Sequence, residues 1–270
     1  MKNSEIITQY YNQYKYPHSK KFLNYIDKTP PIIAKRIEII LRKESEKKCI
    51  DIKNSIILDA GTSCGWTYIH WAENFNNIIG ADCDFINALK ITKKRLKNPR
   101  KLIVCDFKYL PFKNEVFEII ISNTTVEHID NPKMMIEEFH RIIKKNGFLY
   151  YSTANKLWII EPHYNLFFLS YLPKKLANLY LKFFGLKVSY NDINLPTYSQ
   201  FRNIIIEHFN FYDLTFDLLN KPNEYNLIEE RGKLVIFVSF IFHLLGRKIY
   251  AVLKYISMGW VFICTPKEKK

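Results

Sequence analysis

Short apolar runs alternate with helical patterns in the part of the chain that follows residue 50. The first run, SIILDA at 55–60, is followed by others at 77–81, 102–105, 117–122 and 148–153. Apolar residues at helical spacing fill the stretches 66–74, 85–96 and 132–145 between them. Short apolar runs are typical of buried strands, and strands that alternate with helices indicate βαβ units. The pattern therefore predicts a parallel sheet covered by helices on both faces.

The pattern changes on either side of this alternating region. An aromatic, proline-punctuated segment follows residue 153 and is longer than an ordinary crossover. Beyond it we expect a helix at 197–209, a strand at 211–218, an apolar basic helical region at 231–257 and a last strand at 259–265. We divide the chain into an N-terminal helical cap (1–50), a core (51–153), an inserted helical lid (154–196) and the C-terminal part of the core (197–270).

The composition is that of a folded protein with an excess of positive charge. Of the 270 residues, 48% are hydrophobic and 16% aromatic, which excludes a disordered chain. The net charge of +14 is spread along the chain, but 87–104 and 231–267 contain no acidic residue. We interpret the first stretch as a solvated helix face. The charge alone permits a nucleic acid or an anionic membrane as partner.

The cysteines and the apolar runs bear on the cellular compartment. The five cysteines show no CxxC or Cys/His metal spacing, so we expect reduced thiols and no metal. The N-terminus is polar and shows no secretory signal. The longest apolar run, at 234–245, is shorter than the roughly 18–20 residues of a spanning helix. We therefore expect a cytoplasmic protein.

Glycine is scarce, and its distribution points to a ligand site. Three of the eight glycines, Gly61, Gly65 and Gly80, lie within twenty residues of one another. Gly61 and Gly65 follow the first predicted strand, where ligands of open parallel sheets bind, and glycine lets a backbone turn closely under a ligand. The dinucleotide fingerprint GxGxxG is not matched, because Ser63 occupies its middle position.

Carboxylates follow the next two strands. Asp82, with Cys83 after it, ends the second strand and could accept hydrogen bonds from both hydroxyls of a ribose. Asp106 and Phe107 follow the third strand, and a carboxylate beside an aromatic ring suits an adenine. Asp106 could equally cap the next turn.

Five motifs in order resemble those of the class I S-adenosylmethionine-dependent methyltransferases, of the broad small-molecule and lipid type. The family's patterns are (L/I)LD-x-G-x-G-x-G, G-x-D, D-x-x-x-L-P-F, F-D-x-(V/I)-x-S…H-(V/I) and R-(V/I)-L-K-P-G-G. They match residues 57–65, 80–82, 106–112, 117–122 with 128–129, and 141–147. The resemblance covers about 55–153 and implies a Rossmann-like α/β fold with a seven-stranded, mostly parallel sheet.

The resemblance also assigns cofactor contacts. Asp59 and Gly61 would lie near the methionine part of S-adenosylmethionine, Asp82 would hold the ribose, and Asn123 would lie beside the sulfonium. Asp106 and Phe107 would flank the adenine, and the same motifs add Thr62, Gly65 and Cys83. The chain departs from the family pattern at Ser63, Glu118 and Asn146. Since none of these removes an expected cofactor contact, we do not interpret the domain as inactive.

Candidates for the chemical step lie after the fourth strand and in the insert. A hydroxyl acceptor gains from a base, and His128, Glu161 and His163 are the candidates. His128 could instead brace its loop, and His163 could be a hydrogen-bonded packing residue. The insert usually covers the active site in this family and contacts the acceptor.

The insert bears on the acceptor. Residues 174–187 place their apolar side chains on one helical face: Leu176, Leu179, Tyr180, Phe183 and Phe184. Such a basic amphipathic helix is typical of an interfacial helix, although it could also be buried in a lid. An interfacial helix would place the protein at the inner membrane face and admit a lipid-linked acceptor. A softer resemblance links the insert to methyltransferases of glycans and lipid-linked sugars.

The sequence thus predicts methyl transfer to oxygen of a small-molecule, glycan or lipid-linked acceptor. An RNA methyltransferase is an alternative that the charge permits, but the fourth strand is followed by SNTT and not by the (N/D)PP(Y/F) clamp. We do not expect a nucleic-acid partner. A non-catalytic cofactor-binding protein is the third hypothesis, and the oligomeric state is left open.

Overall fold

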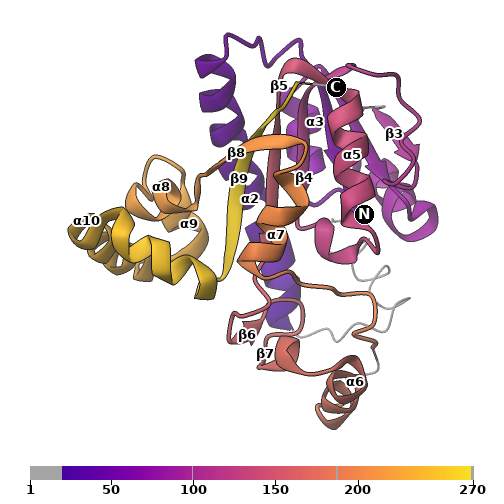
Figure 1. The fold of residues 1–270 in the computed structure, drawn as a ribbon. Helices are drawn as coiled ribbons and strands as arrows, with labels where there is room; N and C mark the ends of the chain where they lie inside the picture. Colours follow the sequence, from indigo (N-terminus) through magenta and orange to yellow (C-terminus); the bar gives the residue numbers. More distant parts are fainter. Residues whose placement is uncertain (1–19, 99, 187, 269–270) are drawn as a thin grey trace.

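A twisted sheet of seven strands forms the centre of the computed structural model, which describes residues 20–98, 100–186 and 188–268 (Figure 1). The strands lie in the order β3-β2-β1-β4-β5-β9-β8. Their bounds are β1 Ile56–Ala60, β2 Asn77–Asp82, β3 Lys101–Val104, β4 Phe117–Asn123, β5 Ile143–Ala154, β8 Phe209–Asp213 and β9 Gly259–Pro266. Only β9 runs antiparallel to its neighbours. The predicted seven-stranded, mostly parallel α/β fold is confirmed.

Helices cover both faces of this sheet. They are α2 Lys20–Lys47, α3 Tyr68–Asn74, α4 Lys90–Arg95, α5 Pro132–Ile142, α7 Tyr198–Ile205, α8 Thr215–Asn220, α9 Leu227–Arg231 and α10 Leu234–Leu253. Strand side chains alternate between two cores. Ile57, Ile119 and Tyr150 pack with α2, α3, α8 and α9. Leu58 and Ile120 pack against α5 and α7 on the other face. This alternation explains why the strands read as continuous apolar runs.

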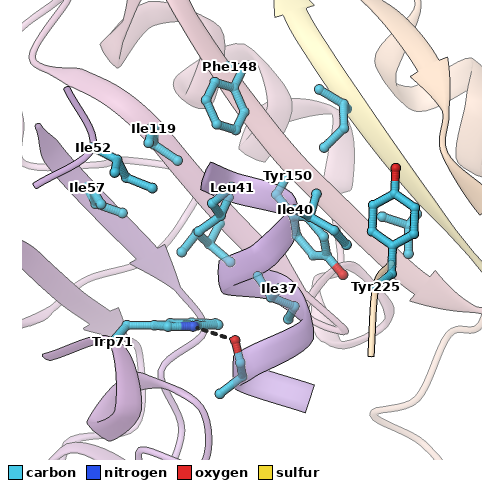
Figure 2. Packing of buried hydrophobic residues seen from close by; sticks show 14 of the residues in the cluster. Ile37, Ile40, Leu41, Ile52, Ile57, Trp71, Ile119, Phe148, Tyr150 and Tyr225 are labelled. Carbon is cyan, nitrogen blue, oxygen red and sulfur yellow. Dashed lines mark hydrogen bonds between the residues drawn. The ribbon is translucent and has the colours of Figure 1, made fainter. Parts of the chain in front are cut away.

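Helix α2 packs across the first core, as Figure 2 shows. Ile37, Ile40 and Leu41 point at the sheet, and the indole Nε1 of Trp71 donates a hydrogen bond of 3.0 Å to the carbonyl of Ala34. On the same helix, Arg36 forms a buried ion pair with Glu230 of α9 at 2.5 Å. The N-terminal and C-terminal parts of the chain are therefore joined by both packing and charge.

The insert lies beyond the carboxyl end of the sheet, at the bottom of Figure 1. It contains a small hairpin of β6 (Ile160–Glu161) and β7 (Leu166–Phe167), a turn η3 (Leu169–Tyr171) and helix α6 (Lys174–Phe183). Its own small core includes Leu169, Ala177, Leu181 and Tyr190. The hairpin was not anticipated, because two-residue strands leave no periodicity to read.

Several element bounds differ from the sequence predictions. The predicted strand at 211–218 ends at Asp213, and α8 follows with Asp213 Oδ1 accepting the N–H of Thr215. The helix expected at 132–145 ends at Ile142, and β5 begins five residues before the predicted start at Phe148. The helix expected at 85–96 is a five-residue π-helical turn, η1 (Phe85–Leu89), followed by α4. The predicted cap falls in part on residues 1–19, which lie outside the described residues.

The apolar region near the C-terminus is broken. Helix α10 changes direction at Gly246, where φ is +65°. Among the described residues, no single helix has the length and apolar character to cross a membrane. The helix pair Leu234–Leu244 and Gly246–Ile256 has the length and composition of a membrane-spanning segment only when its 117° bend is disregarded.

Replacing the buried indole tests the packing of α2. We expect Trp71→Ala to lower the free energy of unfolding by about 3–5 kcal/mol, because it leaves a cavity and removes the indole hydrogen bond to the Ala34 carbonyl. Urea unfolding measures this. Tyr109→Ala, at a side chain that is 70% exposed, is the control and should stay within about 0.5 kcal/mol. Equal effects of the two substitutions would contradict the packing described here.

Candidate active site

The loop between β1 and α3 turns tightly against the end of β2. The N–H groups of Gly61 and Thr62 both donate to the carbonyl of Ala81, at 2.9 and 3.0 Å. Gly61 has φ of +96°, and a Cβ there would lie 2.3 Å from Thr125 Oγ1. Gly65 has φ of +73°, and a Cβ there would lie 2.9 Å from Thr92. Both glycines are therefore required by the loop itself, which brings backbone close to the strand ends.

Ser63 adopts the conformation that a glycine favours. Its φ is +49°, in the left-handed region, which explains why the family motif has glycine there. Two hydrogen bonds hold it: its N–H donates to Asp82 Oδ2 at 2.8 Å, and its carbonyl accepts from Thr92 Oγ1 at 2.7 Å. The departure at Ser63 thus leaves the turn intact.

Asp82 is held at the end of β2 by two backbone groups. Oδ2 accepts from Ser63 N and Oδ1 accepts from Asp84 N at 3.0 Å. Each carboxylate oxygen has a second lone pair, so both can also accept a ligand hydroxyl. Burial raises the pKa of Asp82, against the effect of the backbone hydrogen bonds. Cys83, next in the chain, is exposed, and partial desolvation of its thiol together with the charge of Asp82 raises its pKa.

Asp59 is the most deeply buried carboxylate of the predicted cofactor residues. It is 3% exposed, and its Oδ2 has no hydrogen-bond partner among the described residues. Thr62, also buried, donates from Oγ1 to the backbone carbonyl of Asp59 at 3.1 Å. Burial raises the pKa of Asp59 to about 7. A positively charged ligand group near Oδ2 would favour the ionised form.

The two residues expected beside an adenine differ in exposure. Asp106 is exposed, and its Oδ1 accepts from Lys108 N at 2.9 Å, so it does cap its own turn. Phe107 is 2% exposed and packs edge-on against Phe139 in the core. The ring of Phe107 packs in the apolar layer beneath α5, and its contact with an adenine stays a prediction. Sequence alone does not show which way it turns.

Asn123 ends β4 beside the same edge. Its Oδ1 accepts from Ser152 Oγ of β5 at 2.8 Å. Thr124 follows with φ of +54°, and its N–H donates to the carbonyl of Ser152 at 3.0 Å. This turn leads into η2 (Val126–His128) and aims the two residues of interest there, Glu127 and His128.

The three predicted catalytic residues lie together, and Glu127 joins them. The imidazoles of His128 and His163 meet edge-on with centroids 5.4 Å apart. His163 Nδ1 lies 2.7 Å from Glu161 Oε1, and Glu161 Oε2 accepts from Tyr164 N at 2.8 Å. Glu127 is fully buried and accepts from Thr153 Oγ1 at 3.0 Å. Glu127 was not among the predicted site residues, although it stands next to His128 after a buried strand.

The pKa values of the side chains in this cluster are shifted by desolvation and by neighbouring charges. Partial desolvation by neighbouring protein atoms, followed by repulsion from His163, lowers the pKa of His128 to about 4, so its imidazole is neutral. Desolvation opposes protonation of His163 as well, but the hydrogen bond to Glu161 and two nearby carboxylates raise its pKa overall. Burial raises the pKa of Glu127. The charge of Asp82 slightly opposes the lowering of the pKa of His128.

A cavity of about 720 Å³ lies beside this cluster, between the insert and helices α5 and α7. Its lining includes Lys133, Lys156 and Lys174 and contains no acidic residue. Lys174 Nζ donates to the carbonyl of Tyr190 at 2.9 Å, whereas Asn194 of the lining donates its N–H to the carbonyl of Glu127 at 2.7 Å. The cavity therefore borders the cluster but not the predicted cofactor residues. No sequence motif indicated it.

Comparison with known proteins fits this arrangement. Residues 58–151 match the family described as methyltransferase domain. The chain is 30% identical over 103 residues to a malonyl-[acyl-carrier protein] O-methyltransferase of Hamiltonella defensa, which covers 38% of this chain and 39% of that protein. An uncharacterised protein of Methanocaldococcus jannaschii is 37% identical over 110 residues, or 41% of this chain and 50% of its own length. The chain thus spans half or less of these curated relatives.

A solved structure shares the fold. Phosphoethanolamine N-methyltransferase 2 of Haemonchus contortus, with phosphomonomethylethanolamine and S-adenosylhomocysteine, superposes with a TM-score of 0.50 at 16% identity. The match covers 87% of this chain and 52% of that one. The family match coincides with the strands and loops that carry the predicted site. Residues 58–151 therefore form a methyltransferase domain. The match supports S-adenosylmethionine as the cofactor of this domain.

The donor set of this methyltransferase suits that cofactor. Carboxylates at the ends of β1 and β2 can receive an ammonium group and a ribose, since Asp59 Oδ2 has no hydrogen-bond partner among the described residues and each oxygen of Asp82 has a second lone pair. Which atoms each residue contacts stays a prediction for Asp59, Gly61, Thr62, Gly65, Asp82, Cys83, Asp106, Phe107 and Asn123.

The buried carboxyl of Asp59 gives the cofactor-free methyltransferase a defined pH dependence. Its folded pKa of about 7 exceeds the ordinary value of 3.8, so its contribution to stability is greatest below about pH 4 and is lost as the pH rises to 7. We expect Asp59→Asn to remove this loss. Urea unfolding at pH 5 and pH 8 should show the wild type losing about 2–3 kcal/mol relative to the variant. Parallel pH profiles would contradict the buried carboxyl.

Proposed function

We propose that this protein transfers a methyl group from S-adenosylmethionine to an oxygen atom of a small-molecule, glycan or lipid-linked acceptor. The observation that carries the proposal is the meeting of two groups of side chains at one edge of the sheet. Asp59 and Asp82 lie at the carboxyl ends of β1 and β2, Glu127 and His128 follow β4, and Glu161 and His163 come from the insert.

The cofactor would occupy the ends of β1 and β2. Asp82 would accept from the ribose hydroxyls through its remaining lone pairs, while Ser63 and Asp84 hold it in place. The unpartnered Oδ2 of Asp59 would face the amino group of the methionine part. The exposed Asp106 would accept from the adenine amino group.

Methyl transfer is an in-line displacement at a carbon that the sulfonium already activates. Placing the acceptor oxygen close and aligned therefore supplies much of the rate. A hydroxyl acceptor must also lose its proton, and His163 is placed to receive it. Its Nδ1 is held by Glu161, which fixes the ring and leaves Nε2 to accept a proton.

The lysine-lined cavity would receive the acceptor. It borders the cluster through Asn194, and three lysines without an acid favour an acceptor that carries a phosphate or carboxylate group. The malonyl-[acyl-carrier protein] O-methyltransferase, by its name, acts on an acyl-carrier protein, and that relative matches only part of this chain.

Helix α6 supports contact with an anionic membrane face. Its small buried side is formed by Ala177 and Leu181, whereas large apolar side chains are exposed on the other side: Leu176, Leu179, Phe183 and Phe184. Lys175 and Lys182 on the same helix are exposed as well. An exposed apolar face with flanking lysines is the pattern of an interfacial helix.

Removing one carboxylate tests the cofactor site. We expect Asp82→Ala to weaken S-adenosylmethionine binding at least about 100-fold, because both ribose contacts and the support of the loop are lost. Isothermal titration calorimetry measures this. Asp51→Ala is the matched control, since Asp51 also holds a turn through Lys53 N but lies before β1, at the opposite edge. Unchanged affinity in Asp82→Ala would refute the ribose role.

Vesicle binding tests the membrane contact. We expect the protein to sediment with vesicles that contain phosphatidylglycerol and to do so at least about tenfold less when Leu176, Leu179 and Phe183 are changed to Gln, because apolar surface no longer enters the interface. Phe237→Gln with Phe240→Gln in α10 is the control for unspecific apolar exposure. Failure of the intact protein to bind anionic vesicles would end the interfacial hypothesis.

The acceptor class can be found with labelled cofactor. The protein is incubated with labelled S-adenosylmethionine and a cell extract separated into lipid, polysaccharide, RNA and small-molecule fractions. Label in the lipid or small-molecule fraction supports the proposal, and label in RNA overturns it. Binding of cofactor without labelling of any fraction supports a non-catalytic protein.

A further inference from the structure

We propose that Glu127, His128 and His163 bind a divalent cation such as Zn²⁺ or Mn²⁺ and present it to the acceptor oxygen. The inference deepens the proposed function, on which its catalytic part rests. No motif indicated such a site, because 34 residues lie between His128 and His163 and the cysteines show no ligand spacing.

The spacing of the ligand atoms suits a metal ion. One imidazole nitrogen from each histidine and one carboxylate oxygen of Glu127 all lie within 4.8 Å of one another. Ligand bonds of about 2.1 Å allow two ligand atoms to be up to about 4.2 Å apart. Small side-chain movements therefore bring all three to one ion. Two imidazoles and one carboxylate favour Zn²⁺ or Mn²⁺ over Mg²⁺ and Ca²⁺, which prefer oxygen ligands.

A second observation points to a cation independently of the cluster. Glu127 is 0% exposed, and Oε2 accepts from Thr153 Oγ1. Oε1 is also buried but has no hydrogen-bond partner among the described residues. A buried carboxylate oxygen without a donor is costly, and a bound cation would satisfy it.

The surroundings of His163 are those of a metal ligand. Its Nδ1 lies 2.7 Å from Glu161 Oε1, which leaves Nε2 as the ligand atom. Glu161 is itself fully buried and fixed by Tyr164 N. A carboxylate that holds the second nitrogen of a ligating histidine is the usual outer support of a metal site. Glu161 is therefore a positioning residue in this proposal.

The site would remain open on one side. Glu127 lies at its buried base, whereas His128 and His163 are exposed. Three protein ligands leave coordination positions free, as in catalytic metal sites, and the acceptor hydroxyl would fill one of them. The free coordination positions would thus lie directly after β4, where the acceptor is expected.

The cation would act as a Lewis acid on the acceptor. Coordination lowers the pKa of the hydroxyl, its O–H bond breaks, and the proton passes to solvent water. The oxygen then forms a bond to the methyl carbon while the carbon–sulfur bond breaks, and S-adenosylhomocysteine leaves with the electron pair on sulfur. Without the cation, the same proton would go to His163 Nε2.

Metal binding is measured on the full chain after treatment with EDTA. Titration with ZnCl₂ and MnCl₂ should show one tight site, and Co²⁺ should give a visible absorption band of a nitrogen- and oxygen-ligated ion. We expect His163→Ala and His128→Ala to weaken binding at least about 100-fold, and Glu161→Gln to weaken it about 10–100-fold. Both histidines are exposed, so these variants test the site without removing a core residue.

His70→Ala is the matched control. His70 Nε2 also contacts a glutamate, Glu38 Oε2 at 2.6 Å, but it belongs to no cluster of ligands among the described residues. This variant should bind the metal like the wild type. Weak binding of several ions, or binding that none of the cluster variants changes, would overturn the inference.

Activity separates this inference from the proposed function. Cofactor binding is measured on the same EDTA-treated protein. Cofactor binding together with full methyl transfer in EDTA overturns the metal site and leaves the methyltransferase proposal standing with His163 as base. Loss of transfer in EDTA that Zn²⁺ or Mn²⁺ restores supports the inference. Metal binding at the cluster without cofactor binding would refute the proposed function but not the site.

Discussion

The carbonyl of Ala81 anchors the whole candidate site. It accepts from both Gly61 N and Thr62 N, so the first loop folds back on the end of β2 before α3 begins. Ser63 N then meets Asp82, and the carboxylate is fixed by the loop that it supports. On the other side, Thr125 Oγ1 donates to the carbonyl of Ala60 at 2.8 Å and draws the η2 turn toward the same loop. The loop after β1 and the η2 turn are thus both positioned by the ends of three adjacent strands.

Much of the fold could be predicted because each strand is buried on both faces and leaves a short apolar run. The strand at 211–218 was only half right, since Thr215 begins a helix whose apolar residues continue the run without a break. The hairpin of the insert is too short to leave a pattern. The sheet therefore followed from the sequence, but the insert followed only as a segment of unusual length.

The candidate site divides in the same way. Residues placed by backbone geometry at strand ends, such as Asp59 and Asp82, were predictable from motifs, and the structure places them at one edge. The side chain of Phe107 lies in the core, because burying an aromatic ring has a more favourable free energy than leaving it exposed to water. Glu127 was missed because its burial and its contact with His163 depend on a chain segment far away in sequence. Neither periodicity nor spacing reports such long-range contacts.

The carboxylates of Asp59 and Asp82, at the ends of β1 and β2, have a consequence for turnover. S-adenosylmethionine carries a positive sulfonium, and S-adenosylhomocysteine does not. Carboxylates at the ends of adjacent strands would attract the charged cofactor, and methyl transfer removes one positive charge from it. Each catalytic event would leave Asp59 and Asp82 near a cofactor that they attract less strongly. The electrostatic attraction that favours binding of S-adenosylmethionine would then also favour its exchange for bound S-adenosylhomocysteine, without a conformational change.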